Sequence, residues 1–220
     1  MSETSAGVVL RPIGLAQPMG YCGLATASVL LAGQHLGWFA STEAHAVGLL
    51  VLVSVVPLQA LAAIFSILTR DTVTATSSAL LASTWAAEAA VALGSPPGST
   101  SDPLGVFLLA AGLGLTVPVA AGLSTRVLPS AVPGLAAVSF ILAGLYQLTT
   151  GSLPRHLGGI VELSVAALAL YVAFGLTLEE SLGRPALPLG RRGPARQALE
   201  GDLAAQLDSI AHTPGVRRPA

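Results

Sequence analysis

Long apolar runs separated by short polar turns dominate the chain from residue 19 to residue 178. A lipid hydrocarbon core of about 30 Å requires roughly 20 apolar residues per helix, and each run has about that length. We therefore predict an all-α membrane protein, built as a bundle of six transmembrane helices. The predicted spans are Met19–Phe39, His45–Leu68, Val73–Leu93, Leu104–Thr125, Ser130–Thr149 and Leu157–Leu178.

The connections between these runs predict how the spans are arranged. Three turns, at 41–44, 69–72 and 126–129, are too short to cross the bundle, so consecutive spans must be antiparallel neighbours. A longer segment at 94–103 (GSPPGSTSDP) is rich in turn residues and predicts a loop. One compact bundle follows from this pattern.

Composition and charge support a membrane location and predict an orientation. Only 10% of residues are charged, against about 25% in soluble proteins, and the net charge of −1 gives no basic field for nucleic acid. Nine of the ten arginines fall in the two terminal segments and the loops on their side, whereas Arg155 alone falls on the other side. The positive-inside rule then places both termini in the cytoplasm. We expect a multi-pass protein of the plasma or inner membrane.

Three segments follow from this division. Residues 1–16 form a short cytoplasmic segment, 17–183 the transmembrane domain and 184–220 a cytoplasmic tail. In the tail, Leu199, Leu203, Leu207 and Ile210 recur on one helical face and predict a short amphipathic helix, with a loosely ordered tail as the equal alternative.

Polar residues inside spans are candidates for function, because lipid cannot satisfy their hydrogen bonds. Gln59 lies mid-span beside Pro57, which predicts a kink that either borders a polar path or only serves helix packing. Thr72, Thr76 and Ser83 belong to a hydroxyl-rich third span. These hydroxyls either line the same path or bond back to their own helix carbonyls.

Ionisable groups near the predicted outer ends add a second set of candidates. Glu88 and Glu162 lie about a turn inside their spans, so they either reach the interface or, if buried, stay neutral and carry a proton. His35, His45 and His156 have no metal-ligand spacing, and we interpret them as interfacial, as we do Trp85. No enzyme motif is found, and neither catalysis, a metal nor a cofactor is expected.

The end of span six and the segment after it carry a family resemblance. Tyr171 is followed by an acidic turn and then by G-R-x-x-L-P-x-G, formed by Gly183, Arg184, Leu187, Pro188 and Gly190. This pattern resembles the acetate uptake transporter family, the succinate–acetate permeases, of which the chain looks like a divergent member. Other pieces fit in the same order: Gln17–Gly20, Gly37–Phe39, Gln59, Asp71–Thr72, Trp85, Leu104–Val106 and Arg155–His156.

The resemblance implies a homohexamer of six-span protomers with cytoplasmic termini and one conduction path per protomer. It implies transport of acetate or related small monocarboxylates with a proton. Our own expectation is that Gln59, Thr72, Thr76 and Ser83 line the path. Leu24 and Ser54 stand where the family places aromatics at a narrow apolar constriction, so a wider filter is expected. A non-transporting membrane scaffold or sensor, acting through the tail, is the alternative; a plugged axis would favour it.

Overall fold

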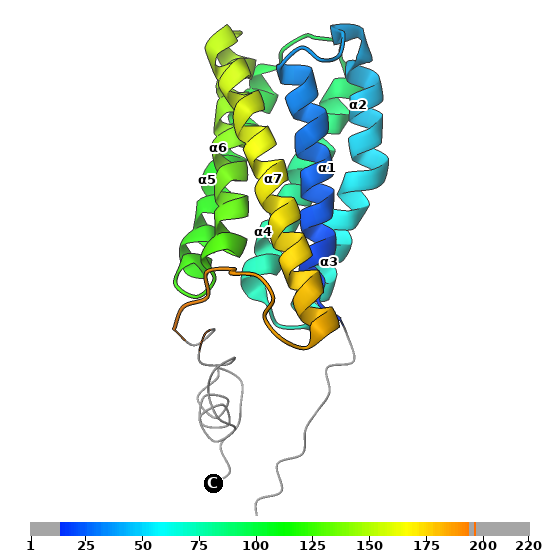
Figure 1. Ribbon diagram of the computed structural model, residues 1–220. Helices are drawn as coiled ribbons and strands as arrows, with labels where there is room; N and C mark the ends of the chain where they lie inside the picture. The colour runs from blue at the N-terminus through cyan, green and yellow to red at the C-terminus, as the bar shows by residue number, and fades with distance from the viewer. Residues whose placement is uncertain (1–13, 194–195, 197–220) are drawn as a thin grey trace, which may run out of the picture.

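The chain is an antiparallel bundle of helices in the computed structural model, which describes residues 14–193 and residue 196. The helices are α1 (Gln17–His35), the 3₁₀ turn η1 (Ser41–Glu43), α2 (Ala44–Leu50), the π turn η2 (Val51–Val55), α3 (Val56–Leu68), α4 (Thr72–Gly94), α5 (Asp102–Leu123), α6 (Val127–Thr149) and α7 (Ser152–Leu182). Figure 1 shows them running alternately up and down, with both ends of the described chain at the same end of the bundle.

The helix bounds agree closely with the predicted spans. Within the described residues, four helical segments are long and apolar enough to cross a membrane: Ser41–Leu68, Asp102–Leu123, Val127–Thr149 and Ser152–Leu182. They identify a multi-pass membrane protein. Helices α1 and α4, with 19 and 23 residues, have the length but are not among the four. Both helices carry many of the polar groups described below, which lowers their hydropathy. Their crossing of the membrane therefore stays a prediction.

The disturbance predicted at Pro57 takes the form of a π turn. Helices α2 and α3 form one continuous rod, interrupted by the π turn immediately before Pro57. A proline inside a helix lacks the N–H donor, and its ring clashes with the carbonyl four residues earlier, here Val53. A π turn widens the helix at that point and accommodates the ring.

Close packing between helices depends on small residues. The most extensive helix contacts join α5 to α6, α1 to α7, α6 to α7 and α3 to α4. Between α5 and α6 the backbones approach so closely that a Cβ atom on Gly144 would lie 2.8 Å from the carbonyl oxygen of Gly105. In the centre, the rings of Trp85 and Phe140 meet edge to face, with centroids 5.1 Å apart.

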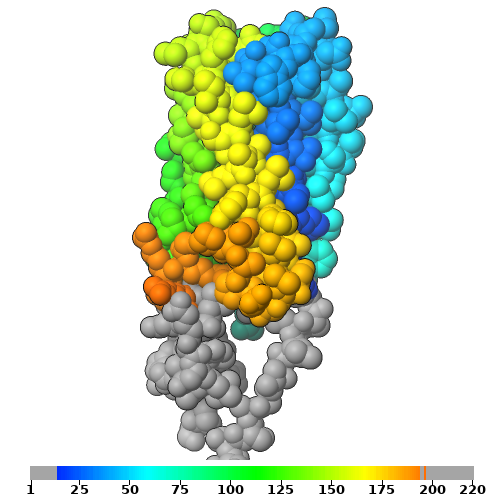
Figure 2. All heavy atoms as spheres, in the orientation of Figure 1, coloured from blue at the N-terminus to red at the C-terminus, as the bar shows by residue number. Residues whose placement is uncertain are grey.

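After α7, residues 184–193 cross the lower end of the bundle; we call them the C-terminal strap (orange in Figures 1 and 2). Backbone hydrogen bonds join it to the start of α6, from Val127 N–H to Gly190 O (3.0 Å) and from Arg192 N–H to Thr125 O (2.8 Å). Arg191 also pairs with Glu179 of α7. The predicted helix around Leu199–Ile210 lies outside the described residues.

The family-like tail motif makes this strap. Gly183 ends α7 with a left-handed φ of 63°, and Gly190, with φ of 69°, lies against Val127. Tyr171 donates a hydrogen bond to the Pro188 carbonyl at 3.4 Å. Leu187 lies against Gly175, whereas Arg184 is exposed. The motif therefore has a structural role in holding the strap against the bundle.

Candidate functional site

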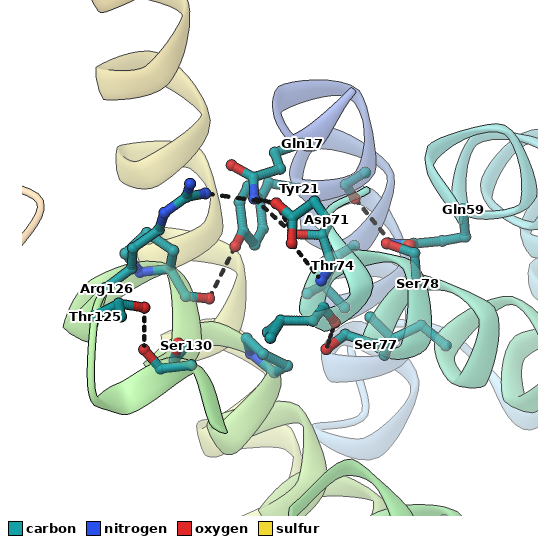
Figure 3. A pocket seen from close by; sticks show the side chains of 17 residues that line it. Gln17, Tyr21, Gln59, Asp71, Thr74, Ser77, Ser78, Thr125, Arg126 and Ser130 are labelled. Atoms are coloured by element: carbon teal, nitrogen blue, oxygen red, sulfur yellow. Dashed lines mark hydrogen bonds and ion pairs between the residues drawn. The ribbon is translucent and has the colours of Figure 1, made fainter. Parts of the chain in front are cut away.

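A cavity of about 150 Å³ opens near the end of the bundle that holds the chain termini; we call it the proximal cavity (Figure 3). Helices α1, α3, α4, α5 and α6 line it. Its polar lining comprises Gln17, Tyr21, Gln59, Asp71, Thr74, Ser77, Ser78, Thr125, Arg126 and Ser130. Helices elsewhere in the bundle bury apolar faces, so this concentration of polar groups marks a candidate site.

The mouth of the proximal cavity is organised around Asp71, the N-cap of α4. Its carboxylate accepts a hydrogen bond from the Thr74 N–H at 3.1 Å, and a second oxygen accepts one from Gln17 Nε2 at 2.7 Å. Arg126, from the turn that the strap holds, lies 3.5 Å from the same carboxylate. One acid and one guanidinium therefore balance each other at the mouth.

Two side-chain amides of the same cavity are only half satisfied, that of Gln17 at the mouth and that of Gln59. Gln59 is 1% exposed and donates to the Gly20 carbonyl at 2.8 Å. The Oε1 atoms of Gln59 and Gln17 are buried and have no hydrogen-bond partner among the described residues. Leaving a buried acceptor unpaired costs about 1–3 kcal/mol. These atoms are therefore suited to a ligand that donates a hydrogen bond.

Apolar side chains close the cavity toward the middle of the bundle. Leu24 of α1, which is 1% exposed, and Leu81 of α4 form its inner wall. The packed pair of Trp85 and Phe140 lies next to this wall, farther along the axis of the bundle. Trp85 is 1% exposed, so the interfacial position predicted for it is wrong. Its ring packs on Phe140 in the core, and its buried Nε1–H has no partner among the described residues. We call Leu24, Leu81, Trp85 and Phe140 the plug.

A second cavity of about 150 Å³, the distal cavity, lies toward the opposite end of the bundle. Helices α1, α4, α5 and α6 contribute to both cavities, so the plug separates two cavities on one axis. The distal lining includes Gln34, His35, Glu88, Tyr146 and Arg155. Glu88 has a buried carboxylate oxygen without a partner among the described residues.

His35 and Glu162 form an ion pair beside the distal cavity. His35 Nδ1 lies 3.0 Å from the Glu162 carboxylate, and their side chains are 12% and 2% exposed. His35, the last residue of α1, is thus largely buried against α7, which supplies the carboxylate. Arg155 donates to the Gln34 carbonyl at 2.9 Å and lies over the Tyr146 ring. Among the described residues, no group of three or more His, Cys, Asp or Glu side chains is placed to hold a metal ion.

The structure separates the other sequence candidates from these cavities. Thr72, Thr76 and Ser83 are exposed on the outer surface of α4, and Ser83 bonds back to the Leu80 carbonyl at 2.9 Å. Ser54 is also exposed and bonds back to Leu50, so it does not meet Leu24 at the plug. The cavity-facing side of α4 is instead the set Thr74, Ser77, Ser78, Leu81, Trp85 and Glu88.

That face could have been recognised from helical spacing. Positions 74, 78, 81, 85 and 88 differ by four, three, four and three residues, and position 77 lies three after 74, which places all six along one side of a helix. The hydroxyls at 72, 76 and 83 lie off this line. Hydroxyl clustering alone did not distinguish the two sides, whereas the line through Trp85 and Glu88 does.

Comparisons with known proteins support the fold. The solved "Structure of the bacterial acetate channel SatP" matches with a TM-score of 0.72 at 23% sequence identity, covering 81% of this chain and 99% of that chain. No family model matches the sequence, and no curated protein does. At this identity the likeness concerns the fold, and the family resemblance found in the sequence is confirmed at that level.

Proposed function

We propose that the protein transports acetate or a related small monocarboxylate across the membrane, together with a proton, through a path inside each protomer. Four buried polar atoms that find no hydrogen-bond partner among the described residues carry this proposal: Oε1 of Gln17 and Gln59, Nε1 of Trp85 and Oε2 of Glu88. They lie in the proximal cavity, the plug and the distal cavity in turn. The likeness to an acetate channel supports the substrate class.

The chemistry of a short carboxylic acid suits these four atoms. Its hydroxyl is a donor for the amide oxygens of Gln17 and Gln59, and its carbonyl accepts from the Trp85 indole N–H. A short alkyl group is compatible with the apolar plug, whereas a larger or doubly charged solute would require more desolvation there. The plug closes the axis in this structure, so transport requires Trp85 or its neighbours to move.

The closed axis also favours the second candidate, a non-transporting membrane scaffold or sensor that acts through its tail. The sealed contact between Trp85 and Phe140 is the observation that supports it. A scaffold has no need of polar cavities on both sides of the seal, or of unpaired buried atoms between them. Transport therefore accounts for more of the structure.

The proposal extends to the assembly and its place in the cell. We infer six membrane-crossing helices per protomer, cytoplasmic termini, a homohexamer and residence in the plasma or inner membrane. Many large apolar side chains are exposed, among them Val117, Ile67 and Phe174, and lipid or neighbouring protomers would cover them. The mass of the purified protein in mild detergent tests the hexamer, and a monomer in several detergents would exclude it.

Uptake of labelled acetate into proteoliposomes across a pH gradient tests the function. Protein-free vesicles give the rate of passive permeation, which is subtracted. We expect protein-dependent uptake, and a loss of about tenfold or more in Gln59→Leu, because the substitution removes the acceptor in the proximal cavity. Ser164→Ala, on the exposed side of α7, is the control and should match the unsubstituted protein. No uptake above passive permeation would favour the scaffold.

A further inference from the structure

Three ionisable side chains from three helices lie at the distal cavity: His35 of α1 and Glu88 of α4 line it, and Glu162 of α7 pairs with His35. They are far apart in sequence, and only the bundle brings them together. His35 and Glu162 are paired at 3.0 Å, whereas Glu88 keeps one buried carboxylate oxygen without a partner among the described residues.

We infer that His35, Glu88 and Glu162 form a proton-exchange site between the distal cavity and the plug, at which the transported acid gives up or regains its proton. This inference rests on the proposed function and specifies which groups handle the proton. Glu88 is the exchanging group, since it lines both the distal cavity and the small pocket that reaches Trp85. The His35–Glu162 pair is the neighbouring proton store.

The surroundings of the site favour a proton over other ligands. A carboxylate without a partner in a low-dielectric bundle is costly, and proton uptake removes that cost without any change in packing. The described residues offer no group of three or more His, Cys, Asp or Glu side chains that could hold a metal ion. A proton is therefore the ligand that these residues can take and release.

The other groups around the site leave its charge balanced. Arg155 of α7 and Tyr146 of α6 are the remaining titratable groups in the distal lining, and Arg155 is directed to the Gln34 carbonyl and the Tyr146 ring. Helix α2 contributes Ala44, α5 contributes Leu104 and the α4–α5 loop contributes Ser95 and Ser99, none of which titrates near neutral pH. Two acids thus face one guanidinium and one imidazole.

The transfer is a simple proton exchange in which no other bond changes. A carboxylic acid arriving through the plug transfers its O–H proton to the Glu88 carboxylate, which leaves a substrate carboxylate and a neutral Glu88 carboxyl. The proton then passes to the Glu162–His35 pair or to the water-accessible side of the cavity. The substrate carboxylate leaves past Arg155, and transport in the opposite direction reverses each step.

Proteoliposomes containing the full chain test this by counting protons and acetates together. An acetate gradient is applied at equal pH, and the membrane potential is clamped with potassium and valinomycin. Labelled acetate and a trapped pH dye then report both initial rates after subtraction of protein-free vesicles. We expect protons and acetates to enter in equal numbers, and both initial rates to fall about tenfold in Glu88→Gln, because the acid can no longer exchange its proton inside the path. In Glu162→Gln both rates should fall in part.

Glu43→Gln is the matched control, because it removes the same charge from an exposed position at the same end of the bundle and should keep the original rates. If Glu88→Gln also moves protons and acetate at the original rates, the proton-exchange site is refuted and the proposed transport stands. If the unsubstituted protein moves no acetate, the proposed function itself fails.

An infrared measurement covers the case in which Glu88→Gln folds but moves nothing. Acid-induced difference spectra of the purified full chain should show a protonated-carboxyl band that is absent from Glu88→Gln and present in Glu43→Gln. Identical bands in all three proteins would overturn the assignment of Glu88, whatever the transport result.

Discussion

At the scale of single residues, the described chain concentrates its unpaired buried polar atoms on one axis. Gln59, Trp85 and Glu88 each keep such an atom, and each faces a cavity or the plug between the cavities. Burial without a partner destabilises the fold by about 1–3 kcal/mol per atom, so folding alone gives no reason for this alignment. A substrate that supplies the missing partners does.

Leu24 and Ser54 were predicted together as the constriction, and their separation in the structure gives a test. Leu24→Phe enlarges a side chain of the plug, so flux of three- and four-carbon acids should fall more than flux of acetate. Ser54→Tyr alters the outer surface and should leave the ratio of these fluxes unchanged. Competition between labelled acetate and unlabelled larger acids in proteoliposomes measures both.

Overpacking is the main complication, because it costs about 1–3 kcal/mol in a dense core. Elution of Leu24→Phe at the volume of the unsubstituted protein would show that the assembly survives. An equal decrease for acetate and larger acids in that properly assembled variant would remove Leu24 from the filter.

The sequence predicted part of the site for clear physical reasons. Gln59 stood out because an amide inside an apolar span is expensive, and it does line the proximal cavity. His35 and Glu162 are 127 positions apart, and their pairing depends on α1 packing against α7, which one sequence does not reveal. Asp71 and Arg126 lie in turns, where charged residues are ordinary, so neither was recognised as part of the site.

At the scale of helices, hydrophobic patterning predicted the bundle well. Each predicted run became one helical rod, because lipid-length apolar segments have few alternatives to helix. The ends agree to within four residues except at α7, Ser152–Leu182, which begins five residues before the predicted span. Hydrophobic patterning did not predict which face of α4 points into the bundle. Small residues cover much of that helix, so apolar periodicity does not distinguish its two sides.

The close contact between α5 and α6 gives a prediction at the helix scale. Gly144→Ala places a Cβ 2.8 Å from a backbone oxygen of α5, which cannot move without displacing the helix. We expect a loss of about 1–3 kcal/mol in stability and a lower thermal midpoint in detergent. Gly114→Ala is the matched control, since its Cβ would meet side-chain atoms of Leu80 no closer than 3.8 Å. Equal midpoints for the two variants would mean that the helices do not pack this closely.

At the scale of the whole molecule, the arginines of the strap and the loops are distributed unequally between the two ends of the bundle. Among the described residues, Arg70, Arg126, Arg184, Arg191 and Arg192 lie at the end that holds both chain termini, with Arg155 at the other. Arg126 has a double role, because it borders the proximal cavity and belongs to the turn that the strap fixes. Orientation and site architecture are thus linked through the same turn.

The asymmetry of arginines predicts that the proximal cavity opens to the cytoplasm and the distal cavity to the outside. Labelling of single cysteines in intact cells checks this, and Cys22 is the natural cysteine to be replaced first by serine. Thr100→Cys, in the exposed α4–α5 loop, should react with a membrane-impermeant maleimide in intact cells. Ser181→Cys, exposed near the end of α7, should react only after the cells are broken. The reverse pattern would invert the orientation, and the proton-exchange site would then face the cytoplasm.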